Sequence, residues 1–140
     1  MNQIRKAALI LLIALVPAVA AGLLHPNRPA WTRPGAKNEI DLPTALQWGS
    51  RLLWVDARPR AEFEAGHIPG AVLLNEDEWE RQLDGFLDAW KRDSVVVVYC
   101  STVSCDASRG VAARLKSEAR IDDVYVLKGG WETWQVASKK

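Results

Sequence analysis

From Ile40 onward, short runs of apolar residues alternate with segments in which apolar residues recur at helical spacing. Four of these runs have the length and the β-branched or aromatic composition of buried strands, and they cover residues 52–55, 71–74, 95–99 and 124–127. Strands that alternate with helices along a chain usually pair in parallel. The pattern therefore predicts an α/β fold in which helices flank a central parallel sheet.

The helices between these strands are marked by residues that start or stop helices. Pro43 suits a first helical turn and Gly49 a C-terminal cap, which brackets a short helix. Asn75, with Glu78 three residues later, resembles a capping box in front of a longer helix. Helices are expected at residues 43–49, 59–65, 79–90 and 106–119, and from residue 131 toward the C-terminus.

The first 37 residues follow a different pattern. Arg5 and Lys6 precede 18 uncharged residues, 7–24, a length that approaches the roughly 20 residues of a membrane-spanning helix. We expect residues 1–24 to form an apolar helix that stays attached as a membrane anchor, although the small residues at 18–20 also permit cleavage as a signal peptide. Residues 25–37 contain three prolines and predict a stiff linker, so the folded domain is expected at residues 38–136.

The balance of charges narrows the choice of partners. The net charge is +1, and two of the 18 basic residues lie in the leader, so 16 bases balance 17 acids in the remainder. This balance gives no indication of nucleic-acid binding. We expect the chain to contact a membrane through residues 7–24, with the domain on the periplasmic or other extracytoplasmic side.

The strongest candidate for chemistry is Cys100, which directly follows the buried run Val95–Tyr99. The carboxyl end of a central strand is where α/β sheets bind ligands, and the N-terminus of the following helix can stabilise a thiolate. A cysteine beside a valine run can also be an ordinary core residue, so its position alone leaves both interpretations open. The candidate loop residues around it are Ser101, Thr102, Val103, Ser104, Asp106, Ser108 and Arg109, with a second cysteine at Cys105.

Three segments together resemble the rhodanese domain. They are Val55–Arg58 with Glu62–Ala71, then Val97–Cys100, and then Val124–Trp131. The resemblance implies a rhodanese-like fold with a five-stranded parallel sheet. It also implies that Cys100 accepts a sulfane sulfur as a persulfide, with a small sulfur compound or a protein persulfide or thiol as partner. We expect neither a metal nor a cofactor.

Other residues of these segments are expected to support the cysteine loop. In rhodanese-like sequences the region of Asp56, Arg58 and His67 is chiefly structural, so we expect the first two to tie loops together by hydrogen bonds. The turn that follows His67 accounts for this histidine without a chemical role. Gly129 and Gly130 are expected to let the backbone turn tightly near the cysteine.

The loop departs from the usual rhodanese pattern, in which six residues run from the cysteine to an arginine, both included, and a serine that starts the helix follows the arginine. If Ser108 is that serine, the loop is two residues longer and Ala107 stands where the arginine is expected. Arg109 is then the nearest base, and Asp106 adds a negative charge. A dianion such as thiosulfate is repelled by a carboxylate, so we expect free thiosulfate to be a poor donor.

Three other functions compete with sulfur transfer. A phosphatase of the related cell-cycle class needs a cysteine and an arginine that bracket a phosphate, and neither Cys100 nor Cys105 has the required spacing to Arg109. A dithiol redox protein would use Cys100 and Cys105, and the second cysteine could resolve a persulfide on the first. An inactive rhodanese-like binding module would use neither.

Overall fold

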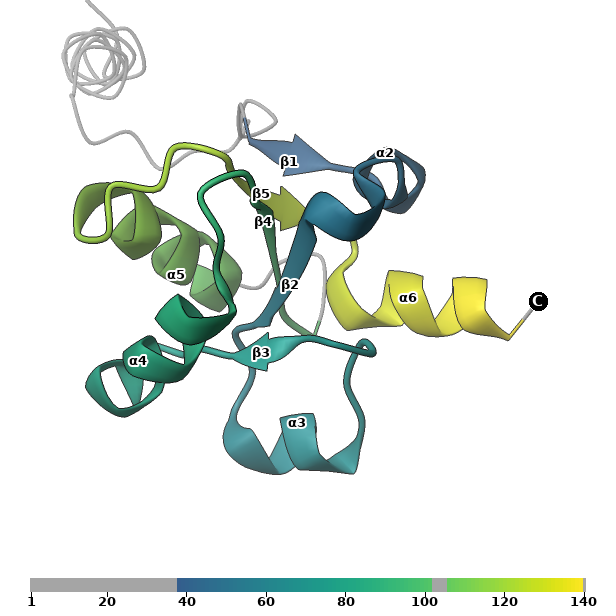
Figure 1. The fold of residues 1–140 in the computed structure, drawn as a ribbon. Helices are drawn as coiled ribbons and strands as arrows, with labels where there is room; N and C mark the ends of the chain where they lie inside the picture. Colours follow the sequence, from purple (N-terminus) through teal and green to yellow (C-terminus); the bar gives the residue numbers. More distant parts are fainter. Residues whose placement is uncertain (1–37, 102–105, 140) are drawn as a thin grey trace, which may run out of the picture. The chain divides into compact units, whose positions relative to one another are not determined.

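One parallel sheet organises the part of the chain that the computed structural model describes, residues 38–101 and 106–139 (Figure 1). Its five strands lie in the order β1-β5-β4-β2-β3, and every neighbouring pair is parallel. The strands are β1 (Glu39–Ile40), β2 (Leu52–Asp56), β3 (Val72–Leu73), β4 (Val95–Tyr99) and β5 (Val124–Leu127). The predicted five-stranded parallel α/β fold is therefore confirmed.

β4 is the central strand, and its composition explains why. All five of its residues are buried, and it pairs with β2 on one side and with β5 on the other. β-Branched side chains pack well on both faces of a pleated sheet, so a strand covered on both faces is read as a continuous apolar run. The Val95–Tyr99 run thus places Cys100, the residue that follows it, at the end of the central strand.

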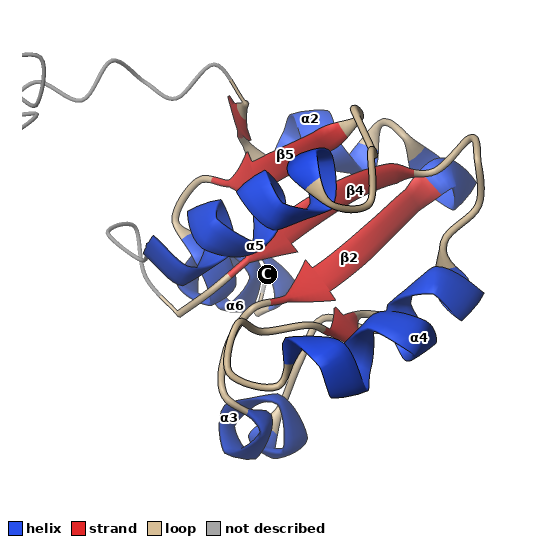
Figure 2. Ribbon diagram, turned by 90° about the vertical axis from the view of Figure 1, so that its left-hand side faces the viewer, coloured by secondary structure: helices blue, strands red, loops and turns tan. Residues whose placement is uncertain are grey.

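Helices cover both faces of the sheet (Figure 2). On one face, α4 (Trp79–Ala89) and α5 (Asp106–Ser117) pack against Val96 and Val98. The opposite face packs α2 (Leu42–Leu46) and α6 (Gly130–Ser138) against the alternate residues of β4, Val97 and Tyr99. This division follows directly from the two-residue period of a strand.

The short helix α3 (Arg60–Ala65) differs from the others because it buries none of its own residues. It lies beyond the carboxyl end of β2, between that strand and β3 (Figure 1). Gly66 closes its C-terminus, and the Gly66 N–H donates to the carbonyls of Glu62 and Phe63. α3 thus forms a projection beside the end of the sheet at which Cys100 lies.

Two helix ends differ from the sequence prediction. Gly49 does not cap α2, which ends at Leu46, and instead begins a 3₁₀ turn, Gly49–Arg51. Before α4, the Asn75 side chain accepts from the Glu78 N–H at 2.9 Å, but the reciprocal acceptor for the Asn75 N–H is the side chain of Gln82. The Glu78 carboxylate is instead paired with Arg60 at 2.7 Å.

The predicted anchor, residues 1–24, and the predicted linker, residues 25–37, fall outside the described part of the chain. Among the helices of residues 38–101 and 106–139, none has the length and apolar character needed to span a bilayer.

Candidate active site

Cys100 lies directly beyond the carboxyl end of β4, between the ends of β2 and β5. Its side chain is buried and belongs to the core cluster on the α4 and α5 face of the sheet. The cysteine is therefore part of the core. It also lies at the carboxyl ends of the strands, where parallel α/β proteins bind ligands.

The first turn of α5 approaches the cysteine sulfur. The Sγ atom of Cys100 lies 3.5 Å from the Oγ atom of Ser108, which is also buried. A hydroxyl at this position can donate to an anionic sulfur, and the N-terminus of a helix adds a favourable partial positive charge. The structure thus places Ser108 in the first turn of α5, beside Cys100.

The turn before α6 holds the backbone of Cys100. The Trp131 N–H donates to the Cys100 carbonyl oxygen at 2.7 Å. Gly130, with φ of 51°, lies so close that a Cβ atom there would overlap the same oxygen. Since left-handed backbone also disfavours side chains, only glycine fits here without a shift of the cysteine. This agrees with the expected tight turn at Gly129 and Gly130.

Asp56 and Arg58 form a buried pair at the end of β2. The Arg58 Nη2 atom donates to Asp56 Oδ2 at 2.6 Å and to the Gly66 carbonyl oxygen at 2.7 Å. Its guanidinium also lies over the rings of Trp131, at 4.7 Å, and Tyr99, at 5.6 Å. Burial lowers the pKa of Arg58, but the hydrogen bonds and charge of Asp56 outweigh it, and the net shift is upward. Arg58 therefore connects the end of β2, the α3 loop and the turn that holds Cys100.

Tyr99 and His67 support the same region. The Tyr99 hydroxyl accepts from the Ile68 N–H at 3.1 Å, and burial of the phenol raises the pKa of Tyr99 well above its ordinary value. The His67 ring is stacked on Phe63 at 3.9 Å, and its Nδ1 atom lies 2.9 Å from the Phe63 carbonyl oxygen. His67 thus shapes the turn that leaves α3.

Acidic side chains contact Ser101, which follows the cysteine, and Arg109 in the first turn of α5. Ser101 Oγ donates to Glu62 Oε2 on α3 at 2.8 Å. Arg109 is paired with Glu39 of β1 at 2.7 Å and with Asp106 at 3.2 Å. The hydrogen bond to Glu39 raises the pKa of Arg109. Sequence reasoning missed Glu62 and Glu39, because no local spacing links residues that are so far apart along the chain.

Part of the predicted loop lies outside the described residues: Thr102, Val103, Ser104 and Cys105. Cys100 itself is disulfide-bonded in the structure. In residues 38–101 and 106–139, no three acidic, histidine or cysteine side chains gather as metal ligands.

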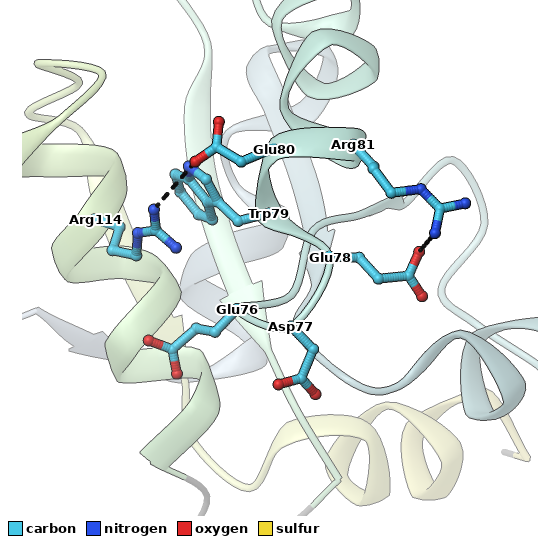
Figure 3. A pocket seen from close by; sticks show the side chains of 7 residues that line it. All are labelled: Glu76, Asp77, Glu78, Trp79, Glu80, Arg81 and Arg114. Atoms are coloured by element: carbon cyan, nitrogen blue, oxygen red, sulfur yellow. Dashed lines mark ion pairs between the residues drawn. The ribbon is translucent and has the colours of Figure 1, made fainter.

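A separate hollow opens between the start of α4 and the middle of α5 (Figure 3). Two of its lining residues are in contact: the Arg114 guanidinium lies over the Trp79 ring at 4.1 Å. Glu76 extends toward α5, where its carboxylate lies 2.6 Å from the position that a Cβ atom of Gly110 would take. Four of the residues that line the hollow are acidic, and the full lining is Glu76, Asp77, Glu78, Trp79, Glu80, Arg81 and Arg114.

The fold and the site together define an α/β protein with a cysteine at the carboxyl end of its central strand. Residues 40–137 match the family model of the rhodanese-like domain. A thiosulfate sulfurtransferase GlpE of Pseudomonas fluorescens is 36% identical over 81 residues, which cover 58% of this chain and 68% of that protein. A second GlpE, from Shewanella oneidensis, is 36% identical over 84 residues, covering 60% and 76% of the two chains.

A solved structure agrees at the level of the fold. The BH2092 protein of Bacillus halodurans superposes with a TM-score of 0.59 at 23% identity, covering 72% of this chain and 73% of that one. The family match extends over most of the chain, and the chain belongs to the rhodanese-like family.

Proposed function

We propose that this protein is a rhodanese-type sulfurtransferase or persulfide carrier in which Cys100 accepts the sulfur. The observation that carries the proposal is the position of the Cys100 sulfur, 3.5 Å from the buried Ser108 hydroxyl in the first turn of α5. Similarity to curated thiosulfate sulfurtransferases supports the same chemistry.

The reaction needs a thiolate and a sulfane sulfur. The Cys100 thiolate attacks the outer sulfur of the donor, a sulfur–sulfur bond forms, and the donor's own sulfur–sulfur bond breaks to release a thiolate or sulfite. A second nucleophile then takes the outer sulfur from Cys100. Ser108 and the N-terminus of α5 stabilise the anionic sulfur between these steps, while Trp131 holds the cysteine carbonyl.

Cyanide-labile sulfur on the reduced, sulfur-loaded protein tests the proposal. Cys100→Ser should abolish it, and Cys105→Ser should retain part of it. Ser108→Ala should slow loading without abolishing it, since it removes one donor from the anion. Loading that survives Cys100→Ser would refute the assignment, and a wild-type protein that never loads would favour an inactive binding module.

A dithiol redox function is a second candidate. Support for it comes from the disulfide bond at Cys100 and from the sequence, which contains one other cysteine, Cys105. In this scheme the Cys105 thiolate attacks Cys100 Sγ of the persulfide, expels hydrosulfide and leaves a disulfide that an external dithiol reduces. Thiol counting under denaturing conditions after air oxidation tests it, because two free thiols in the oxidised monomer would exclude the bond.

We also propose that residues 1–24 anchor the domain on the extracytoplasmic side of a membrane. The support is the basic start followed by 18 uncharged residues. The full chain should sediment with membranes after expression and resist extraction by high salt. Recovery of the full-length chain as a freely soluble cytoplasmic protein would refute the proposal.

A further inference from the structure

We infer that the Cys100 site selects a sulfane-sulfur donor that reacts without net negative charge, such as the protonated persulfide of an uncharged thiol, over a small sulfur oxyanion. Glu62 is the residue that determines this selectivity. The inference rests on the proposed sulfur transfer to Cys100 and extends it to the class of donor.

Glu62 is fixed beside the cysteine by its contact with the next residue. Ser101 Oγ donates to Glu62 Oε2 at 2.8 Å, and Arg58 Nη1 lies 3.8 Å from the same oxygen. No residue of α3 is buried in the core. The hydrogen bond between Glu62 and Ser101 therefore connects this helix directly to the residue after Cys100. The Glu62 carboxylate is thus held against the residue that directly follows Cys100.

The cations near the site are already paired with carboxylates. Arg58 is bound to Asp56 and stacked on Trp131, which keeps its guanidinium buried. Arg109 is held by Glu39 at 2.7 Å and by Asp106 at 3.2 Å. A bidentate guanidinium is the usual partner of a small oxyanion, and both described candidates have their hydrogen-bonding groups engaged elsewhere.

Two further carboxylates lie along α5. Asp106 opens this helix and is largely exposed. Glu76 reaches the helix from the loop before α4, with its carboxylate against Gly110 (Figure 3). These acids oppose the attraction that the N-terminus of α5 offers to a dianion. These carboxylates do not repel a donor that carries no net charge.

The size of the effect follows from the chain geometry. Adjacent Cα atoms lie about 3.8 Å apart, so the Ser101 contact keeps the Glu62 carboxylate within about 9 Å of the Cys100 Cα atom. At that distance in water, Coulomb repulsion of a dianion by one carboxylate corresponds to about a fivefold loss of rate, and to about a twofold loss near 0.1 M salt. Removing the charge of Glu62 should reverse this loss.

The experiment compares two donors on the reduced full-length protein. Thiosulfate transfers its outer sulfur to the Cys100 thiolate and leaves as sulfite, whereas the protonated form of 2-hydroxyethyl persulfide transfers its outer sulfur and leaves as the thiolate of 2-hydroxyethanethiol. Both donors are compared at one fixed pH. The quantity measured is the rate constant for thiosulfate divided by that for the persulfide. A change in the nucleophilicity of Cys100 affects both donors, so the ratio isolates the repulsion.

Glu62→Gln should raise this ratio about fivefold at low ionic strength, and the gain should shrink as salt is added. Glu39→Gln should also raise it, because it frees Arg109 from its partner at 2.7 Å. Glu64→Gln, which removes an exposed acid from the same helix, is the matched control and should change the ratio less than Glu62→Gln.

The outcomes separate this inference from the proposed function. A wild-type protein that prefers thiosulfate, or a ratio that Glu62→Gln does not change, would overturn the inference while sulfur transfer stands. Failure of both donors to load Cys100 would overturn the proposed function itself.

Discussion

Gly130→Ala is the substitution for which the structure predicts the clearest effect on the site. The new Cβ atom would overlap the Cys100 carbonyl oxygen, and the residue would have to keep φ of 51°. A non-glycine residue in left-handed backbone costs about 1–2 kcal/mol. To relieve the overlap, the backbone must also stretch the 2.7 Å hydrogen bond from Trp131 to Cys100, whose loss costs about 0.5–1.5 kcal/mol.

Gly49→Ala is a matched control for the conformational part of this cost. Gly49 has φ of 54°, nearly that of Gly130, but no atom lies within 4 Å of the Cβ position. We therefore expect Gly130→Ala to lower the free energy of unfolding by about 2–3 kcal/mol and Gly49→Ala by about 1–2 kcal/mol. Urea denaturation of the two variants and the wild type measures the difference.

Sulfur loading gives the second measurement. Moving the Cys100 backbone displaces its sulfur from Ser108, so loading of Gly130→Ala should slow about tenfold or more, while Gly49→Ala loads at the wild-type rate. If Gly130→Ala and Gly49→Ala lose the same free energy of unfolding and load sulfur at the same rate, the turn before α6 does not position the cysteine.

Two further predictions concern the buried polar groups under the site. Asp56→Ala should lower the free energy of unfolding by about 3–5 kcal/mol in urea denaturation, because it leaves the buried charge of Arg58 without its partner; a loss below 1 kcal/mol would contradict this. Because the pKa of Tyr99 is higher in the folded than in the unfolded chain, its stabilising contribution is complete below pH 10 and is lost as the pH rises above that value. Thermal unfolding between pH 9 and about 11 should therefore show a smaller fall in Tm for Tyr99→Phe than for the wild type, and parallel curves would exclude the linkage.

Local patterns predicted most of the fold. The Val95–Tyr99 run has both its bounds and its central place in the sheet as expected, because a strand buried on both faces leaves a continuous apolar signature. The start of α4 was harder to predict. The Asn75 N–H donates to the side chain of Gln82 rather than of Glu78, and the Glu78 carboxylate pairs with Arg60. Both Glu78 and Gln82 could accept from the Asn75 N–H. The ion pair of Glu78 with Arg60, which is distant in the sequence, leaves Gln82 as the acceptor.

The surroundings of the cysteine were less predictable. The position of Cys100 after β4 follows from the strand, and the proximity of Gly130 follows from the need for a tight turn. In contrast, the pairing of Arg109 with Glu39 joins residues 70 positions apart, and the contact of Ser101 with Glu62 joins residues 39 apart. Such contacts depend on how the sheet orders its strands, so no spacing along the chain signals them.

The mass of the reduced protein before and after incubation with a sulfane-sulfur donor tests the central claim most directly. We expect a gain of one sulfur atom, which peptide mass analysis locates on Cys100, which cyanide removes and which Cys100→Ser lacks. An unchanged mass with every donor, or a sulfur atom located on a residue other than Cys100, would contradict it.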